Sequence, residues 1–337
     1  LGSDGKFSCL ESISSFLQAN KKTTTKFVSP HLVNLQSRIW LKNKFISLKE
    51  IRKYERKISR LKVKLSLFEV LTLIYILAAS KAKADYNCVE AGMLFKGDST
   101  RVWKEPLLQA CVNLNKQHLE WVYPKTINEI CRQKVGYMSN NTNIYIGKQK
   151  PKVMKIVKKI LKKNNSNITY PSSWKIIKKN KKLFFKPKII EKTIPKIKFE
   201  GRLDYIRKGK LRKLLNKNEE LILDGSHSSE SATNLYNYLK NLNKEIYGIW
   251  GMQKNKSPTE YLKKFRGIFK EIITFKIPGE PNALDSKTLK NIATKQGYIA
   301  HEAVNIKETF KKVSSKKRKL IVLFGSLYGV GSALKFN

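Results

Sequence analysis

The sequence is poor in acidic residues. It has 25 Asp and Glu against 69 Lys and Arg, a formal net charge of +44 at pH 7 that ordinarily points to nucleic acid. Arginine is scarce as well, because the basic excess is overwhelmingly lysine and residues 148–198 contain no arginine. Specific nucleic-acid sites favour arginine for bidentate and stacking contacts. We therefore predict no specific nucleic-acid partner and keep nonspecific binding at low salt as an alternative.

Cysteines and long apolar runs are also few. The four cysteines, Cys9, Cys88, Cys111 and Cys131, show no C-x-x-C spacing and fall inside apolar runs. They predict reduced core residues of a cytoplasmic protein, not a disulfide framework or a zinc site. The longest apolar run, residues 65–79, is shorter than the roughly 20 residues of a membrane span. It predicts a buried helix, and we expect no membrane partner.

A chain of 337 residues, 41% of them hydrophobic, predicts two domains. The chain begins at Leu1 without a methionine. A candidate phosphate loop follows at once, where a strand normally comes first. We therefore expect an N-terminally incomplete sequence.

The first residues have the composition of a phosphate-binding loop. Residues 2–8 read Gly2-Ser3-Asp4-Gly5-Lys6-Phe7-Ser8 and run into an apolar-periodic segment, residues 9–19, that predicts a helix. The N–H groups of a glycine turn and of a helix N-terminus bind anions, lysine adds a charge, and a hydroxyl can hold Mg²⁺. The spacing G-x-x-G-K-x-S differs from the commoner G-x-x-x-x-G-K-[ST]. A Ser or Asp cap of the helix is the alternative for this stretch.

After this helix, a strand-like run at residues 26–29 ends in Ser29-Pro30-His31-Leu32. Together the two segments resemble the folylpolyglutamate synthase and dihydrofolate synthase family, ATP-dependent relatives of the Mur ligases. That family has a G-T-N-G-K-G-S loop and a strand ending in S-P-H-L. Phe7 stands where the family keeps a glycine, which places a ring where backbone approaches phosphate. The resemblance implies an α/β fold with a P-loop-containing Mur-ligase-like central domain built on a parallel sheet, and a smaller Rossmann-like C-terminal α/β domain.

A strand-like run at residues 86–90 ends in Glu90. A carboxylate at the carboxyl end of a buried strand faces the crevice where open α/β sheets bind ligands. The run resembles the family's E-V-G-L-G-G-R-L-D-A-T-N, whose glutamate is a magnesium ligand. This chain keeps Glu90, Gly92, Asp98 and Thr100, and has Leu94-Phe95 in place of the double glycine. A solvated glutamate at a strand end is the alternative.

The next expected strand, residues 110–115, leads to His118 and resembles the family's T-N-I-x-x-D-H, with Gln117 replacing the aspartate. The resemblance implies that Ser29, Glu90 and His118 hold magnesium, with Ser8 contributing from the loop. Lys134 lies in a helix-like run, residues 126–136, and matches a lysine that the family carbamylates near a second magnesium. A lysine on an exposed helix end is the alternative.

The boundary between the domains is expected near residue 198. A strand at 143–147 and a basic helix at 153–163 close the first domain, and residues 164–198 predict a basic linker. We predict an ATP-binding domain at 1–198 and a C-terminal glutamate-ligase domain at 199–337. The family's L-x-G-x-H-Q-x-x-N-A segment is missing, which an internal deletion would explain.

The second domain opens with Gly201-Arg202-Leu203-Asp204, which resembles the family's G-R-L-E with its phosphate-contacting arginine. The strand-like residues 221–228 end in Asp-Gly-Ser-His-Ser and resemble L-D-G-A-H-N. The resemblance implies that Asp224 and His227 reach toward the nucleotide and the reacting centre; a turn and helix cap is the alternative. Strands at 246–251, 272–277 and 320–324 and helices at 259–270 and 286–295, the first opened by Ser257-Pro258, predict βα units.

The resemblance implies an ATP-dependent amide ligase with ATP and Mg²⁺ as cofactors. The γ-phosphoryl group would pass to a carboxylate of a folate or dihydropteroate, and L-glutamate would attack the acyl phosphate. The protein would be a cytoplasmic monomer. The implied catalytic residues are Lys134, Asp224 and His227, and the implied ATP-binding residues are Gly2, Ser3, Asp4, Gly5, Lys6, Ser8, Arg202 and Asp224. The alternatives are an inactive homologue, a Mur-type cell-wall peptide ligase and a basic protein that binds nucleic acid nonspecifically.

Overall fold

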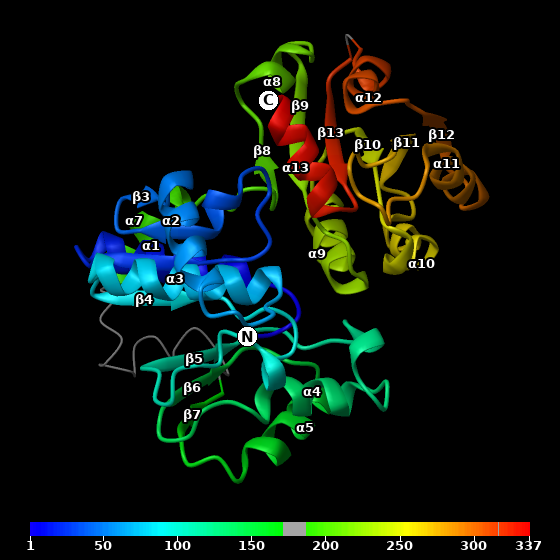
Figure 1. The fold of residues 1–337 in the computed structure, drawn as a ribbon. Helices are drawn as coiled ribbons and strands as arrows, with labels where there is room; N and C mark the ends of the chain where they lie inside the picture. The colour runs from blue at the N-terminus through cyan, green and yellow to red at the C-terminus, as the bar shows by residue number, and fades with distance from the viewer. Residues whose placement is uncertain (171–186, 316) are drawn as a thin grey trace. The chain divides into compact units, whose positions relative to one another are not determined.

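The computed structural model describes residues 1–170, 187–315 and 317–337 and divides into two compact units, Leu1–Ile197 and Lys198–Asn337. Figure 1 shows that each unit combines strands with helices, which confirms the α/β prediction. We describe each unit by itself.

The first half of unit 1 is built on a mixed sheet of order β3-β2-β1-β4. β1 and β4 are parallel, whereas β1, β2 and β3 are antiparallel neighbours. Its elements are α1 (Lys6–Ala19), β1 (Thr24–Phe27), η1 (Leu35–Arg38), β2 (Ile39–Leu41), β3 (Lys44–Phe45), α2 (Leu48–Ser59), α3 (Leu67–Ala82) and β4 (Tyr86–Val89).

Local sequence explains why α2 and α3 start where they do. Ser47 and Ser66 each form a capping box with a glutamate three residues later, which satisfies backbone N–H groups that the helix leaves unpaired. α3, predicted as a buried helix, packs its Tyr75 ring on Phe27 of β1 with the centroids 5.2 Å apart. This packing holds α3 against the sheet to which β4 also belongs.

The second half of unit 1 has a parallel sheet of order β5-β6-β7. Its elements are η2 (Phe95–Gly97), β5 (Leu108–Cys111), η3 (Leu119–Trp121), α4 (Ile127–Val135), β6 (Asn143–Ile146), α5 (Pro151–Leu161), β7 (Asn167–Thr169), α7 (Pro187–Thr193) and η4 (Ile194–Lys196). β7 and α7 fall inside the segment predicted as a basic linker, and α7 packs on α1. Both ends of that segment therefore belong to the folded unit, because apolar side chains such as Ile168 join the core; residues 171–186 lie outside the described residues.

Unit 2 is a six-stranded sheet of order β12-β11-β10-β13-β9-β8, parallel except for β8. Its elements are β8 (Asp204–Tyr205), α8 (Lys210–Lys213), β9 (Glu219–Asp224), α9 (Ser229–Leu239), β10 (Ile246–Trp250), η5 (Lys254–Lys256), α10 (Pro258–Leu262), η6 (Lys263–Phe265), β11 (Phe269–Thr274), α11 (Ser286–Lys295), β12 (Ile299–Glu302), α12 (Ile306–Val313), β13 (Lys319–Phe324) and α13 (Leu327–Phe336).

The strand order of unit 2 reverses once. The chain moves outward from β9 through β10 and β11 to β12 and then returns to β13, which lies between β10 and β9. Since parallel crossovers are right-handed, the outward helices α9, α10 and α11 cover one face and the returning helix α12 covers the other. The strand order reverses at β13. Open α/β sheets bind ligands beside the carboxyl ends of the strands at such a reversal, which here are the ends of β9, β10 and β13.

One predicted helix of unit 2 is shorter than expected. The prediction ran from 259 to 270, but α10 ends at Leu262, a 3₁₀ turn follows, and Gly267 takes φ 79° before β11 begins at Phe269. The strand predicted at 272–277 therefore begins three residues earlier. Ser257 does not cap the helix through its side chain, because it takes a left-handed conformation with φ 50°.

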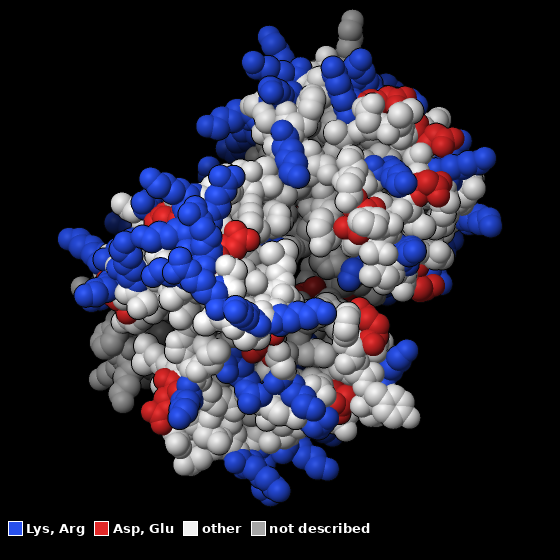
Figure 2. Space-filling view, viewed as in Figure 1, with Lys and Arg blue, Asp and Glu red and all other residues white. Residues whose placement is uncertain are grey.

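The surface is rich in basic side chains. On the face in Figure 2, Lys and Arg cover much of both units, gather most densely over α2, and greatly outnumber Asp and Glu. No helix among the described residues has the length and apolar character needed to cross a membrane.

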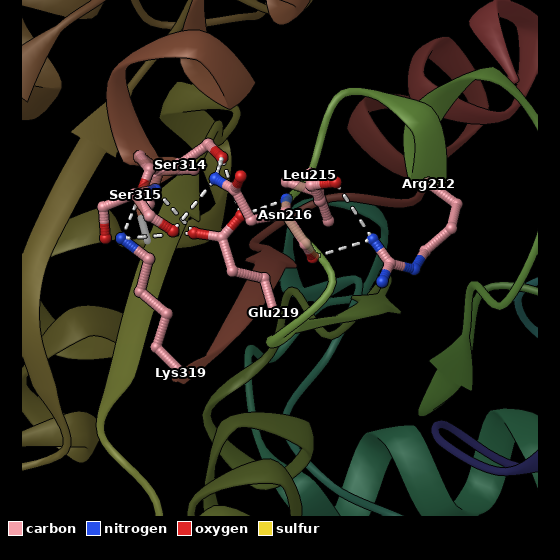
Figure 3. Close-up of polar contacts among 8 residues, drawn as sticks. Arg212, Leu215, Asn216, Glu219, Ser314, Ser315 and Lys319 are labelled. Atoms are coloured by element: carbon pink, nitrogen blue, oxygen red, sulfur yellow. Dashed lines mark hydrogen bonds and ion pairs between the residues drawn. The ribbon is translucent and has the colours of Figure 1, made fainter. Parts of the chain in front are cut away.

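A buried ion pair ties the amino ends of β9 and β13 together (Figure 3). Lys319 Nζ lies 3.6 Å from Glu219 Oε1, and the two side chains are 4% and 0% exposed. Glu219 also accepts hydrogen bonds from Ser314 Oγ at 2.6 Å, Ser315 N at 2.7 Å and Asn216 N at 2.8 Å. The carboxylate is thereby satisfied on both oxygens, as a buried charge requires.

We expect Lys319→Met to lower the free energy of unfolding by about 3 kcal/mol, because it leaves a buried carboxylate without its counter-charge. Lys244→Met is the matched control: Lys244 pairs with the neighbouring Glu220, but these side chains are 28% and 41% exposed. That change should cost less than about 1 kcal/mol. Urea unfolding of both variants tests this, and equal losses would contradict a special role for the buried pair.

Candidate functional site

The candidate phosphate loop leads directly into a helix without a side-chain cap. α1 starts at Lys6 after Gly5, which has φ 89°, and within the described residues this N-cap position has no side-chain cap hydrogen bond. Ser8 lies in the first turn, and its carbonyl accepts a hydrogen bond from Ser12. The cap expected as the alternative is therefore absent. Uncapped N–H groups beside a lysine fit an anion such as a phosphate chain.

The loop lies along the segment that follows β5. Ser3 N donates to Asn113 O at 2.7 Å, and Asp4 forms an isolated antiparallel bridge with Asn113. The Asp4 carboxylate accepts from Asn115 Nδ2 at 2.6 Å and from Gln117 Nε2 at 3.0 Å. Asn115 Oδ1 is buried and has no partner among the described residues, so an acceptor remains for water or a ligand.

Glu90 occupies the end of β4, as predicted, and lies beside Ser29. Its Oε2 accepts a hydrogen bond from Ser29 N at 3.1 Å, and the glutamate is 5% exposed. Asp98 organises the loop beyond it by accepting from Gly92 N at 2.7 Å and from Thr100 N at 2.9 Å. A carboxylate and a serine held together at a strand edge fit a hard cation such as Mg²⁺.

His118, the third predicted magnesium ligand, follows Gln117 in the left-handed conformation, with φ 60°, and directly precedes η3. The part of the chain that the structure describes holds no cluster of three or more His, Cys, Asp or Glu residues arranged for a metal ion. The predicted set contains only two residues of these types, with a serine as the third. The grouping of Ser29, Glu90 and His118 around magnesium therefore stays a prediction.

Lys134 is buried, unlike the exposed lysine considered as the alternative. It is 1% exposed, and its Nζ donates to Gly2 O at 2.9 Å and also to Met93 O. Burial, followed by the nearby charge of Lys6, lowers the pKa of Lys134 to about 7. A neutral amine is the form that reacts with carbon dioxide. The contact also joins the phosphate loop to the loop after Glu90.

The predicted residues of unit 2 gather around Gly225. Asp224 ends β9, and its carboxylate accepts from Leu203 N and Ser226 N, each at 2.9 Å. Burial raises the pKa of the Asp224 carboxyl, whereas the hydrogen bonds from Leu203 and Ser226 and, to a smaller extent, the positive charge of Arg202 lower it. A Cβ at position 225 would lie 2.2 Å from Leu327 Cδ2 and 3.1 Å from Arg202 Nη1, so glycine leaves room first for Leu327 and then for the guanidinium.

The corner after Gly225 is held from two sides. His227 Nδ1 lies 2.8 Å from Gly225 O, and Ser228 caps α9 through a capping box with Ser231. The predicted alternative, a helix cap, is therefore present in addition to the cluster. Tyr261 Oη bonds both Ser226 Oγ at 2.8 Å and Ser226 O at 2.9 Å.

Sequence reasoning missed the partners of the predicted residues. Gln117 was noted only as a departure from a motif, yet it binds Asp4; Tyr261 received no role, yet it holds Ser226. The only sequence signal for the role of Gln117 was that a polar residue replaces an acid inside a motif. The predicted residues form two groups, one in each unit, and their functional roles stay predictions.

Comparisons with known proteins show which proteins this chain is similar to. A sequence model for the family described as "Dihydrofolate synthetase, C-terminal domain" matches residues 207–336. A dihydrofolate synthetase of Saccharomyces cerevisiae is 23% identical over 393 residues, covering 100% of this chain and 92% of the yeast protein.

Two solved structures share the fold. A folylpolyglutamate synthase of Mycobacterium tuberculosis, complexed with ADP and AMPPCP, is 20% identical and covers 99% of this chain and 89% of its own, with a TM-score of 0.83. A bifunctional folylpolyglutamate synthase/dihydrofolate synthase of Yersinia pestis, complexed with AMPPNP and manganese, is 16% identical and covers 99% and 87%, with a TM-score of 0.85. The likeness confirms the predicted α/β fold.

Burial of Lys134 predicts a pH-dependent stability. Its pKa is about 7 in the folded chain and returns to the ordinary 10.5 on unfolding, so between these values the unfolded chain binds the extra proton. Stability should therefore rise with pH across this window and be flat below it. In CO₂-free buffer, the difference in unfolding free energy between wild type and Lys134→Met should grow by about 3.5 kcal/mol from pH 7 to pH 10.

The exposed lysine Lys125 supplies the control, because Lys125→Met should give a difference that does not change with pH. Denaturant unfolding at a series of pH values measures both. A difference for Lys134→Met that stays constant from pH 7 to pH 10 would show that the Lys134 amine remains charged.

Proposed function

We propose that the chain belongs to the folylpolyglutamate synthase and dihydrofolate synthase family and that it is an ATP-dependent ligase that joins L-glutamate to a folate or to dihydropteroate. The observation that carries the proposal is the contact of Lys134 with both Gly2 O and Met93 O. This contact draws the phosphate loop toward the segment that follows the strand-end acid Glu90. A triphosphate and its cation require these two elements together.

The phosphate loop supplies the positive end of the site. Gly2, Ser3, Asp4 and Gly5 shape it, and the uncapped N–H groups of α1 together with Lys6 would bind the phosphates. Ser29, Glu90 and His118 would hold magnesium, with Ser8 in the loop. When bound, the ion neutralises charge on the phosphoryl oxygens.

Lys134 is supported as the carbamylated lysine because burial lowers the pKa of its amine to about 7, so that a large share of the amine is neutral near pH 7. Carbamylation would convert a cation into an anion, which suits a residue near divalent metal. The two carbonyl contacts hold Nζ in one position for this change.

Arg202 and Asp224 are proposed to contact the nucleotide, and Asp224 and His227 to serve the reacting centre. Because the carbonyl of Gly225 can only accept, His227 Nδ1 carries the proton of their 2.8 Å contact. Nε2 of the neutral ring then has the lone pair. We propose that this Nε2 accepts the proton that the amine of L-glutamate loses when it attacks the acyl phosphate.

The folate acceptor is preferred over a cell-wall precursor. The family match and the yeast relative are both named for dihydrofolate synthetase. The ADP-release assay below separates an active ligase from an inactive homologue.

We expect purified protein to release ADP from ATP only when L-glutamate and a folate or pteroate acceptor are both present. Glu90→Ala and Lys6→Ala should each lower the rate at least about 100-fold, because each removes charge that neutralises or binds the phosphates. The measurement is ADP release with each acceptor separately.

Glu55→Ala is the control for Glu90→Ala, because Glu55 is an exposed glutamate of α2 in the same unit. It should keep the wild-type rate. No ADP release with either acceptor, or release that continues unchanged in Glu90→Ala, would contradict the proposed function.

A further inference from the structure

Asp4 is an acid inside a loop that is proposed to bind an anion, so its charge needs an explanation. It lies between Gly2 and Gly5, whose φ values of 129° and 89° are available to glycine and strained for other residues. A carboxylate directed at a phosphate would oppose binding. The structure shows instead that the carboxylate is engaged by side-chain amides.

Two amide groups converge on this carboxylate. Gln117 Nε2 lies 3.0 Å from both Oδ1 and Oδ2 of Asp4, and Asn115 Nδ2 lies 2.6 Å from Oδ2. An ionised carboxylate has acceptors only, so it can receive both amides at once. An asparagine at position 4 would present one oxygen and one N–H₂ group, and the latter would oppose the donors. The carboxylate of Asp4 is therefore matched to the amide donors of Asn115 and Gln117.

The backbone carries the same connection. Ser3 N donates to Asn113 O at 2.7 Å, and Ser3 Oγ receives a hydrogen bond from Asn115 N at 3.1 Å. The loop is thus laid along residues 113–117 on one side and enters α1 at Lys6 on the other. The residue after Gln117 is His118. A single clamp therefore connects the start of α1 to the segment that ends at His118.

Compared with the family motifs, this chain has exchanged an acid and an amide between positions 4 and 117. The family loop G-T-N-G-K-G-S has an amide where this chain has Asp4, and the family's T-N-I-x-x-D-H has an acid where this chain has Gln117. Acid and amide have changed places, and the 3.0 Å contacts show that the two residues face each other. The two departures from the motif are thus complementary to each other.

We propose that Asp4 is a positioning residue of the nucleotide site and that Gln117 is its matched partner. The carboxylate–amide pair fixes the loop on residues 113–117, so that Lys6 and the first N–H groups of α1 keep the geometry that receives phosphate. Asp4 itself contacts no phosphate. This inference rests on the proposed function, because it assumes that the loop binds ATP.

An isosteric exchange tests the pair. Gln117→Glu places two carboxylates against each other and should weaken ATP binding about tenfold, since the amide donor is lost and like charges face. The double variant Asp4→Asn with Gln117→Glu restores one acid and one amide with their roles reversed. Its affinity should return to within about twofold of wild type, because interacting residues are not additive. Calorimetry with ATP and Mg²⁺ measures the affinity, and thermal melts report folding.

A charge-matched control separates pairing from net charge. Glu120 is exposed and lies three residues from Gln117. Glu120→Gln combined with Gln117→Glu restores the net charge without restoring the pair, so it should stay about tenfold weak. Restoration of affinity by this control, or wild-type affinity in Gln117→Glu alone, would overturn the proposal. A wild-type protein that binds no ATP would instead overturn the proposed function and the clamp's role with it.

Discussion

The carboxyl ends of parallel strands constrain where this protein can carry polar chemistry. Buried parallel strands need apolar side chains along their length, so acids and amides are tolerated where the ladder stops. Glu90 directly follows β4, Asp224 ends β9, and residues 113–118 follow β5. In both units the candidate residues therefore occupy the same kind of position, although the sheets differ in order and in the mixture of parallel and antiparallel pairs.

The pairing of β9 with β13 fixes the position of the carboxyl end of β9, where Asp224 lies. Its register pairs Lys319 with Glu219 at one end and Phe324 with Asp224 at the other. The buried ion pair holds the amino ends together, far along the ladder from the corner at Gly225. Between them, the facing apolar residues are fully buried. A sliding of one strand past the other would separate a buried carboxylate from its counter-charge, so the same pairing that secures the fold also fixes Asp224.

Sequence patterns predicted those features that depend on nearby residues. Strand ends at Glu90 and Asp224 and the helix at Ser286–Lys295 were predictable because burial periodicity and motif spacing are local. The helix expected at 259–270 was too long, because the turn at Gly267 is set by the need to start β11 beside β10. The clamp of Asp4 by Gln117 was not predictable, since it joins residues separated by 113 positions.

The residues that differ from the family motifs are of two kinds: some form hydrogen bonds with other side chains, and one cannot. Gln117 binds Asp4, and Ser226, which replaces an alanine, is held by two hydrogen bonds with Tyr261. Phe7 differs, because its side chain is apolar and offers no polar group to pair. It is half-buried in the first turn of α1, directly after Lys6, where backbone N–H groups face an incoming anion. A ring at this position adds bulk where the family motif has a glycine, and polar pairing elsewhere in the loop does not remove that bulk.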